Sequence, residues 1–171
     1  MKILAVQSRM GIGDTVIFLP FIKALSKKFN SPISILVKEN SKANQYLHQT
    51  KYIDKILTLE RDNKTNNRHG GFFGIFKLAN DLKKYKFDKI FIFNSSLRFN
   101  LVAKISGIPQ IYQYPLFAKN KQHIIEAPKK FLKKNLDLDI NEDPEVQIDS
   151  NLISKAAQKF QIDKNTTNIL L

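Results

Sequence analysis

The sequence predicts an α/β fold, a Rossmann-like open parallel sheet with helices on both faces. Short apolar runs alternate with segments whose apolar residues recur at helical spacing throughout the 171 residues. The run at residues 89–93 is apolar almost without interruption, as strands buried on both faces are. A turn with two glycines, residues 8–13, joins the first run to the first helical segment. This turn places free backbone N–H groups at the carboxyl edge of the sheet, where ligands bind in open α/β folds.

The apolar runs set the expected strands. Five strands and the start of a sixth are expected at residues 2–7, 32–37, 55–59, 89–93, 110–114 and 167–171. The acidic stretch 137–149 is interpreted as a connector that leaves the main sheet. Because the sixth run is an apolar strand reached only at the end of the sequence, we expect it to begin a further domain.

Between the strands, the spacing predicts helices over residues 14–29, 41–49, 72–85, 97–106, a segment ending at 136, and 151–160. Asp14 and Ser41 are residue types that cap helices, so each is expected at the N-cap of its helix. Residues 94–96 are expected to cap the helix that follows the fourth strand. Pro20 is expected to kink the first helix, because it removes a backbone hydrogen bond.

The third helix carries several aromatic residues, and it follows a polar stretch, residues 60–71, which we interpret as a mobile surface loop containing His69. Five apolar side chains share one face of the helix and are expected in the core: Phe72, Ile75, Phe76, Ala79 and Leu82. The alternative is that residues 71–74 form an edge that lies against a membrane surface.

The formal net charge of +13 is the strongest compositional feature. It is compatible with attraction to phosphate-rich surfaces such as anionic lipid, lipid A or nucleic acid, and equally with a general bias toward lysine. No nucleic-acid-binding motif accompanies the charge, so no nucleic-acid partner is predicted. There are no cysteines, no secretory signal and no apolar stretch of membrane-spanning length, which fits a cytoplasmic protein.

Asp14 is the candidate site residue that the chain's order singles out. It follows Gly11 and Gly13 directly, at the edge where a ligand of a parallel sheet would lie. The glycines complete neither the GxGxxG nor the P-loop pattern, so taken alone they favour a plain tight turn with Asp14 as a cap. Three histidines without metal-ligand spacing, and no cysteine, predict neither a metal site nor a cofactor.

Residues 2–25, which read KILAVQSRMGIGDTVIFLPFIKAL, resemble the opening of the lipopolysaccharide heptosyltransferases, glycosyltransferase family 9. Further segments match the family's motifs in the same order: residues 52–56 (YIDKI), 87–90 (FDKI), 107–109 (GIP) and 122–126 (QHIIE). The sequence departs from the family pattern at residues 94–96, where Asn-Ser-Ser replaces an Asp-x-Gln/His-Gly ending. The resemblance covers only the amino-terminal half of the family.

The resemblance implies the amino-terminal half of a GT-B type glycosyltransferase. Residues 1–150 would form an acceptor-side Rossmann-like domain, and residues 151–171 a linker helix and the first strand of a missing donor-binding domain. The implied reaction moves heptose from ADP-heptose to the lipid A–core of lipopolysaccharide, at the inner face of the inner membrane, with peripheral contact to anionic lipid. Asp14 would act as the catalytic base, as the matching aspartate does in the family.

The loops that follow the strands carry the cations expected to bind the acceptor. Together with the glycines, the predicted substrate-binding residues are Gly11, Gly13, Arg61, Arg68, Lys119, Lys121 and His123. A half-molecule is expected to be inactive alone. The alternative from another class is a non-catalytic Rossmann-like module that binds an anionic ligand or partner.

Overall fold

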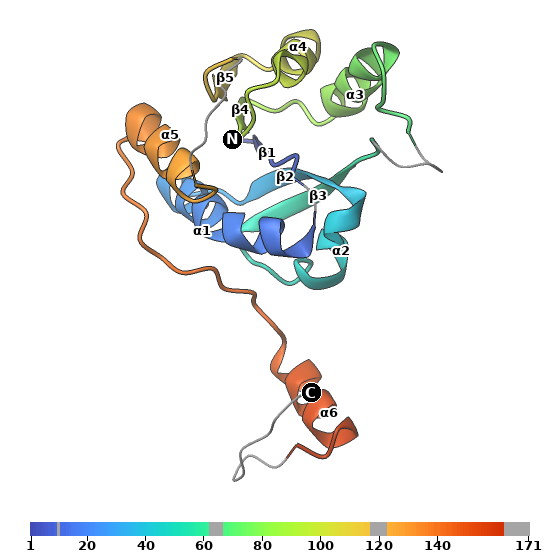
Figure 1. The fold of residues 1–171 in the computed structure, drawn as a ribbon, viewed down its shortest axis with the longest axis vertical. Helices are drawn as coiled ribbons and strands as arrows, with labels where there is room; N and C mark the ends of the chain where they lie inside the picture. The colour runs from blue at the N-terminus through green and yellow to red at the C-terminus, as the bar shows by residue number, and fades with distance from the viewer. Residues whose placement is uncertain (10, 62–66, 117–122, 163–171) are drawn as a thin grey trace.

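A computed structural model describes residues 1–9, 11–61, 67–116 and 123–162, which form an α/β fold around one sheet (Figure 1). Its five strands are β1 (Ile3–Val6), β2 (Ile33–Lys38), β3 (Ile53–Leu59), β4 (Lys89–Ile92) and β5 (Gln110–Gln113). They lie in the order β3-β2-β1-β4-β5, and every neighbouring pair is parallel. The predicted open parallel sheet is therefore confirmed. The run at residues 167–171 lies outside the described residues.

Helices cover both faces of the sheet, as predicted. They are α1 (Ile12–Phe29), the short 3-10 turn η1 (Glu39–Ser41), α2 (Ala43–Tyr46), α3 (Phe73–Lys83), α4 (Leu97–Ile105), α5 (Glu126–Leu136) and α6 (Ser150–Lys159). Figure 1 shows α1, α2 and α5 on one side of the sheet, and α3 and α4 on the other. Each of the two faces has its own buried apolar cluster.

Strand alternation explains how one apolar run serves both clusters. In β1, Ile3 and Ala5 pack toward α1, whereas Leu4 and Val6 pack toward α3 and α4. All four side chains are buried, because successive side chains of a strand point to opposite faces and both faces carry helices. The apolar run of β1 therefore reflects the burial of both faces of the sheet.

The start of α1 differs from the prediction. Gly11, not Asp14, occupies the N-cap, with a positive φ of 103° that favours glycine, and no side chain caps the helix. The chain turns into the helix at Ile12, so Asp14 lies within the first helical turn. The helix continues past the buried Pro20 to Phe29.

The second predicted helix is also shorter than expected. Residues 41–49 were expected to form one helix, but η1 ends at Ser41 and α2 spans only Ala43–Tyr46. Lys42 lies between them in the left-handed region at φ 53°, which ends one helix and starts another. By contrast, the side chain of Ser96 caps α4 by accepting a hydrogen bond from the backbone N–H of Arg98, as predicted.

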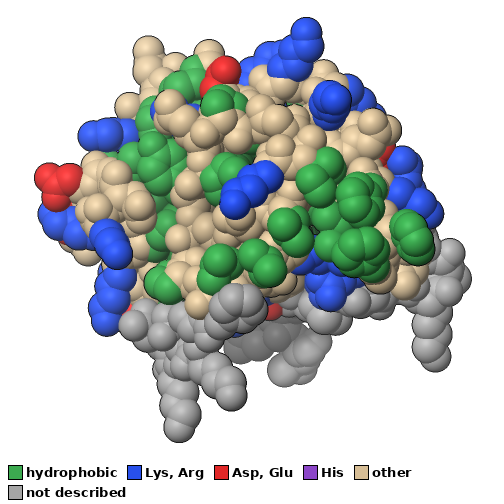
Figure 2. Space-filling view, turned by 90° about the horizontal axis from the view of Figure 1, so that it is seen from above, with side chains coloured by type: hydrophobic (Ala, Val, Ile, Leu, Met, Phe, Trp, Pro, Cys, Tyr) green, Lys and Arg blue, Asp and Glu red, His purple; other side chains and the backbone are tan. Residues whose placement is uncertain are grey.

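The predicted core face of α3 is wrong for two of its five residues. Ile75, Ala79 and Leu82 are buried, but Phe72 and Phe76 are exposed. Leu78 takes their place in the core. Figure 2 shows hydrophobic side chains gathered at the surface on this side of the molecule, among Lys and Arg.

The connector after α5 is tied to the body of the domain although it has no regular structure. Ile140 is buried against the α1 cluster. Glu142 lies 3.0 Å from the ammonium group of Lys23 and also pairs with Lys27. The helix that follows, α6, buries none of its residues (Figure 1). No helix among the described residues is both long and apolar enough to cross a membrane.

Tyr52 offers a test of how the connector is placed. Burial, with the nearby carboxylates of Glu145 and Glu142, raises the pKa of the Tyr52 hydroxyl to about 12. The unfolded chain ionises near the ordinary pKa of 10, so stability is full below pH 10 and is lost as the pH rises toward 12. We expect Tyr52→Phe to flatten this alkaline loss in denaturant titrations between pH 9 and 12. An unchanged slope in that window would contradict the raised pKa of Tyr52, which burial causes first and the connector carboxylates second.

Candidate functional site

The strand order identifies one crevice as the place for a ligand. From β1 the chain proceeds to β2 and β3 on one side, and β4 and β5 lie on the other. The loops after β1 and β4 therefore diverge at their carboxyl ends, and such a switch point is where open α/β sheets bind ligands. The turn that contains Gly11, Gly13 and Asp14 follows β1, a central strand, as predicted.

A buried glutamine holds the loop that follows β1. The side-chain amide of Gln7 donates to the carbonyl oxygen of Asp14 at 3.2 Å, and its oxygen accepts the backbone N–H of Arg9 at 2.8 Å. Gln7 is buried, so these bonds satisfy an amide that water cannot reach. The entry of α1 is thereby fixed to the end of β1.

The loop after β4 is joined to the loop after β1 through Asn94. The Asn94 side-chain oxygen accepts the backbone N–H of Ser96 at 2.6 Å, which turns its NH2 group toward Ser8. That NH2 group lies 2.7 Å from the Ser8 hydroxyl oxygen and donates to it. The departure of residues 94–96 from the family pattern thus has a structural role, because Asn94 bridges the two sides of the crevice.

Gln113 at the end of β5 braces the same loop. Its NH2 group donates to the carbonyl oxygens of Asn94 and Ser96 at 3.0 and 2.9 Å. Its oxygen consequently faces Asn100 of α4, whose NH2 group donates at 3.0 Å. Sequence reasoning missed these amides. The signal available was an amide side chain at or within two residues of the end of each of three neighbouring strands: Gln7, Asn94 and Gln113.

Asp14 lies in the first turn of α1 and is partly exposed. Within the described part of the chain its carboxylate forms no hydrogen bond or ion pair. The helix N-terminus favours a negative charge here through the helix dipole and the unpaired N–H groups of the first turn. A partly exposed carboxylate with no partner can accept a proton or hydrogen bond from a bound hydroxyl group.

An aromatic group lies just beyond the end of β5. Tyr114 packs edge-on against Phe93 and Phe131, at 5.9 and 5.0 Å between ring centroids. Burial raises the pKa of the Tyr114 hydroxyl, and the positive charge of Arg9 partly opposes that shift. Its hydroxyl oxygen has no hydrogen-bond partner within the described ranges. The Tyr114 side chain therefore remains neutral, close enough to the loop after β1 for the charge of Arg9 to act on it.

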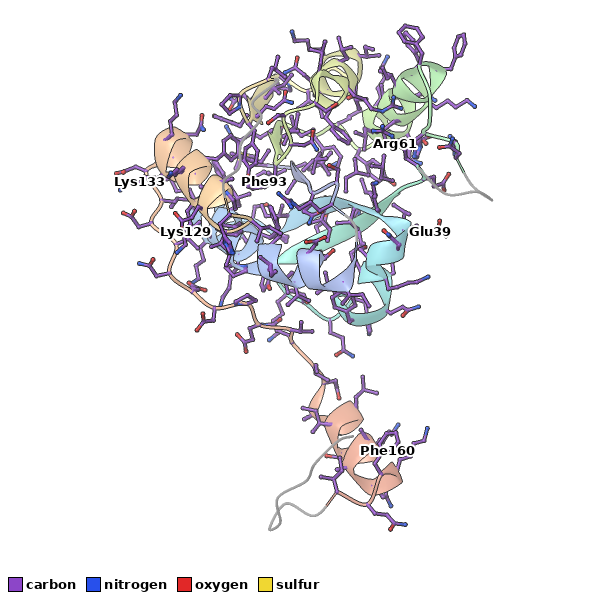
Figure 3. The ribbon with its side chains drawn as sticks, in the orientation of Figure 1. Glu39, Arg61, Phe93, Lys129, Lys133 and Phe160 are labelled. Carbon is purple, nitrogen blue, oxygen red and sulfur yellow. The ribbon has the colours of Figure 1, made fainter. Side chains whose placement is uncertain are left out.

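The predicted basic residues are spread along the edge. Arg61 follows β3, the strand at the end of the sheet, two strands away from β1. In Figure 3 Arg61 lies on the right with Glu39, whereas Phe93 lies near the centre, at the end of β4. Arg68 forms an ion pair with Asp81 of α3 at 2.7 Å. The structure thus places Arg61 at the predicted edge and directs Arg68 toward α3.

Of the other predicted basic residues, the structure describes His123 but not Lys119 or Lys121. His123 is exposed just before α5, where its ring nitrogen Nδ1 accepts the backbone N–H of Ile125 at 3.4 Å. Lys119 and Lys121 lie outside the described residues. The convergence of the basic residues on Asp14 stays a prediction. No cluster of metal-ligand residues occurs in the ranges that the structure describes.

His69 forms a buried clasp that the sequence did not reveal. It was expected in a mobile loop, but it is only 4% exposed. The backbone N–H of Glu60 donates to His69 Nδ1 at 3.1 Å, so the proton of the ring is on Nε2, which donates to Asp81 at 3.0 Å. Arg98 of α4 donates to the carbonyl oxygens of His69 and Gly71. These bonds tie the end of the loop after β3 to α3 and α4.

Comparisons with known proteins identify the fold. No sequence family and no curated protein matches the chain. Among solved structures, a family 9 glycosyltransferase from Veillonella parvula superposes with a TM-score of 0.70 at 19% identity. The fold is a glycosyltransferase fold. That match covers 97% of this chain and 50% of the other.

Two E. coli structures have the same fold. The ADP-heptose lps heptosyltransferase II matches with a TM-score of 0.62 at 15% identity, over 96% of this chain and 52% of the other. Heptosyltransferase WaaC with ADP-2-deoxy-2-fluoro heptose matches at 0.54 and 12% identity, over 83% and 50%. This chain therefore spans about half the length of these glycosyltransferases, and the recognition of a heptosyltransferase-like fold is confirmed.

Proposed function

We propose that the chain is the amino-terminal, acceptor-binding half of an inverting glycosyltransferase that moves heptose from ADP-heptose to a sugar hydroxyl of the lipopolysaccharide inner core. The observation that carries this proposal is the Asp14 carboxylate, which is partly exposed and unpaired among the described residues, at the switch point of the sheet. The heptosyltransferase fold supports the choice of sugar and donor.

The proposed mechanism gives Asp14 one task. The acceptor oxygen attacks the anomeric carbon of the heptose, the bond from that carbon to the oxygen of ADP breaks, and ADP leaves with the electron pair. Asp14 takes the proton from the attacking hydroxyl group, so the acceptor gains nucleophilic character as the new bond forms. Gly11 and Gly13 leave space beside the turn, since a side-chain carbon built at either would contact nothing within 4 Å.

In this proposal the donor nucleotide is bound by residues outside the acceptor half. Arg61, Lys119, Lys121 and His123 are proposed to bind acidic groups of the lipid A–core acceptor, as the loops after the strands would allow. Donor and acceptor would meet at the cytoplasmic face of the inner membrane. No cofactor is assigned a role in the reaction.

Joining the chain to the carboxyl-terminal half of a heptosyltransferase tests the proposal. We expect the joined protein to transfer heptose from ADP-heptose to a truncated core acceptor, and the isolated chain to transfer none. Transfer is measured by mass spectrometry of the acceptor. Transfer by the isolated chain would contradict the division into halves. A joined protein that binds ADP-heptose and acceptor without transfer would instead favour the non-catalytic, anion-binding module.

A further inference from the structure

Three phenylalanines at the start of α3 form an exposed aromatic group, here called the phenylalanine patch. Phe72, Phe73 and Phe76 are 68%, 77% and 48% exposed. Phe72 contacts Phe73 and Phe76 edge-on, with ring centroids 6.0 and 5.7 Å apart. Phe72 thus contacts both of the other rings, and much of each ring's surface remains in water, at a free-energy cost that burial against a partner would remove. Contiguous exposed apolar groups of this kind mark interaction surfaces.

The apolar surface extends to the neighbouring helix. α4 packs beside α3 on the same face of the sheet. Leu97, Leu101 and Ile105 are spaced four residues apart along α4, and all three are exposed. In Figure 2 the hydrophobic side chains over this face are interspersed with Lys and Arg. The face is therefore apolar and cationic together.

The charge around the patch is strongly one-sided. Residues 67–108, which include α3 and α4, contain eight Lys or Arg but only two Asp and no Glu. Both acids are already engaged, since Asp81 pairs with Arg68 and His69, and Asp88 accepts the backbone N–H of Lys2. Lys77, next to Phe76, is exposed. Arg68 and Arg98 are engaged too, Arg68 by Asp81 and Arg98 by backbone carbonyl oxygens, so the exposed lysines of α3 supply the positive charge. A surface of aromatic rings beside exposed lysines is complementary to an anionic bilayer.

The phenylalanine patch is held on a rigid support. Gly74 packs so closely against the carbonyl group of His69 that no side chain fits between them. Arg98 of α4 donates to the carbonyl oxygens of His69 and Gly71, just before the patch. The rings are therefore presented at a fixed position on the helical layer, so little further ordering is needed for binding.

We propose that the α3–α4 face binds an anionic phospholipid bilayer, with Phe72, Phe73 and Phe76 inserted at the level of the headgroups. α3 begins where the chain leaves the carboxyl end of the parallel sheet, the same edge that carries Asp14. Docking by this face therefore brings the edge of the crevice to the membrane surface. The purpose of this docking rests on the proposed function, because the proposed acceptor is anchored in lipid. Binding to vesicles can be measured without any sugar transfer.

Sedimentation with vesicles tests the binding. We expect the whole chain to bind vesicles of phosphatidylglycerol and phosphatidylethanolamine, and to bind phosphatidylcholine vesicles at least about tenfold more weakly. Replacing the patch by serine (F72S/F73S/F76S) should lower the affinity for the anionic vesicles by about tenfold or more. Raising the salt concentration should weaken binding of the wild-type chain, because exposed charges are screened.

A matched control removes the same number of exposed apolar side chains elsewhere. The variant L152S/I153S/F160S changes two exposed residues of α6 and the exposed residue at its C-cap, and should retain wild-type vesicle affinity. An equal loss in both variants would overturn the assignment to the phenylalanine patch. So would a patch variant that binds as the wild type does. Circular dichroism confirms that both variants remain folded.

Fluorescence provides a second measurement in a nearly unchanged protein. The chain has no tryptophan, so Phe73→Trp introduces a single reporter. Its emission should shift to the blue on addition of anionic vesicles and should be quenched by brominated lipid. The control His48→Trp, at an exposed position after α2 on the opposite helical layer, should show neither change. An unshifted Phe73→Trp spectrum would overturn the insertion of the phenylalanine patch into lipid. Patch-dependent self-association without vesicle binding would show that the face binds a second copy of the chain instead.

The two proposals fail separately. Loss of heptose transfer in the joined protein, with vesicle binding intact, would overturn the proposed function and leave the docking face standing. Transfer to a soluble truncated acceptor, with no vesicle binding by the wild-type chain, would overturn the docking face alone.

Discussion

Asp14→Asn is expected to lower heptose transfer by the joined protein by a factor of about 10²–10⁴, the usual contribution of a general base. Asparagine has nearly the shape of aspartate, but its amide cannot take a proton from the acceptor hydroxyl near neutral pH. The measurement is kcat with saturating donor and acceptor. Retention of the wild-type kcat would show that Asp14 is not the base.

In this structure Asp14→Asn should affect catalysis with little effect on the capping of α1, contrary to what the sequence suggested. Had Asp14 been the N-cap, its replacement would also have disturbed a capping hydrogen bond, but Gly11 holds that position and Asp14 makes no such bond. The loss of stability should therefore be limited to the interaction of the charge with the helix dipole, about 0.3–1 kcal/mol. Equilibrium denaturation of the Asp14→Asn protein checks this value and separates a catalytic loss from unfolding.

The sheet could be predicted because its signal is local. The run that became β4 is apolar enough to be buried from both sides, and the glycines after β1 mark the turn into α1. The position of Asp14 at the carboxyl edge of a central strand follows from the same alternation of strand and helix. No contact between distant residues is needed for these inferences, apart from the general rule that places parallel strands side by side.

The rotation of α3 could not be predicted, since it depends on a distant contact. Phe72 and Phe76 fit the same helical spacing as Ile75 and Leu82, so periodicity alone does not choose between them and Leu78. The choice is made by the close approach of Gly74 to the His69 carbonyl, which orients the helix and leaves the rings outside.

The clasp around His69 and the amides that brace the crevice were missed for a similar reason. His69 lies in a polar stretch, and its partner Asp81 is 12 residues away on the next helix. Asn94 and Ser8 are 86 residues apart in the chain and meet only because β4 pairs with β1. Such pairs leave no pattern in a single sequence.

Gly74→Ala is expected to destabilise the protein by about 1–3 kcal/mol, the cost of overpacking a well-filled contact. A β-carbon at this position would lie 2.3 Å from the carbonyl carbon and 2.4 Å from the carbonyl oxygen of His69. Both atoms are backbone, so α3 or the loop must move. Movement of the loop would also disturb the bonds from His69 to Glu60 and Asp81. Equilibrium unfolding in urea measures the loss.

Gly13→Ala is the matched control, because Gly13, like Gly74, is the second residue of its helix. A β-carbon at Gly13 meets no atom within 4 Å, and its backbone φ is not in the positive range. Alanine also has the higher helix propensity, so this variant should be as stable as the wild type or up to about 1 kcal/mol more stable. If Gly74→Ala and Gly13→Ala unfold at the same urea concentration, the close approach of α3 to His69 does not hold the loop. If only Gly74→Ala is destabilised, the close approach of α3 to the His69 carbonyl contributes to the stability of the fold.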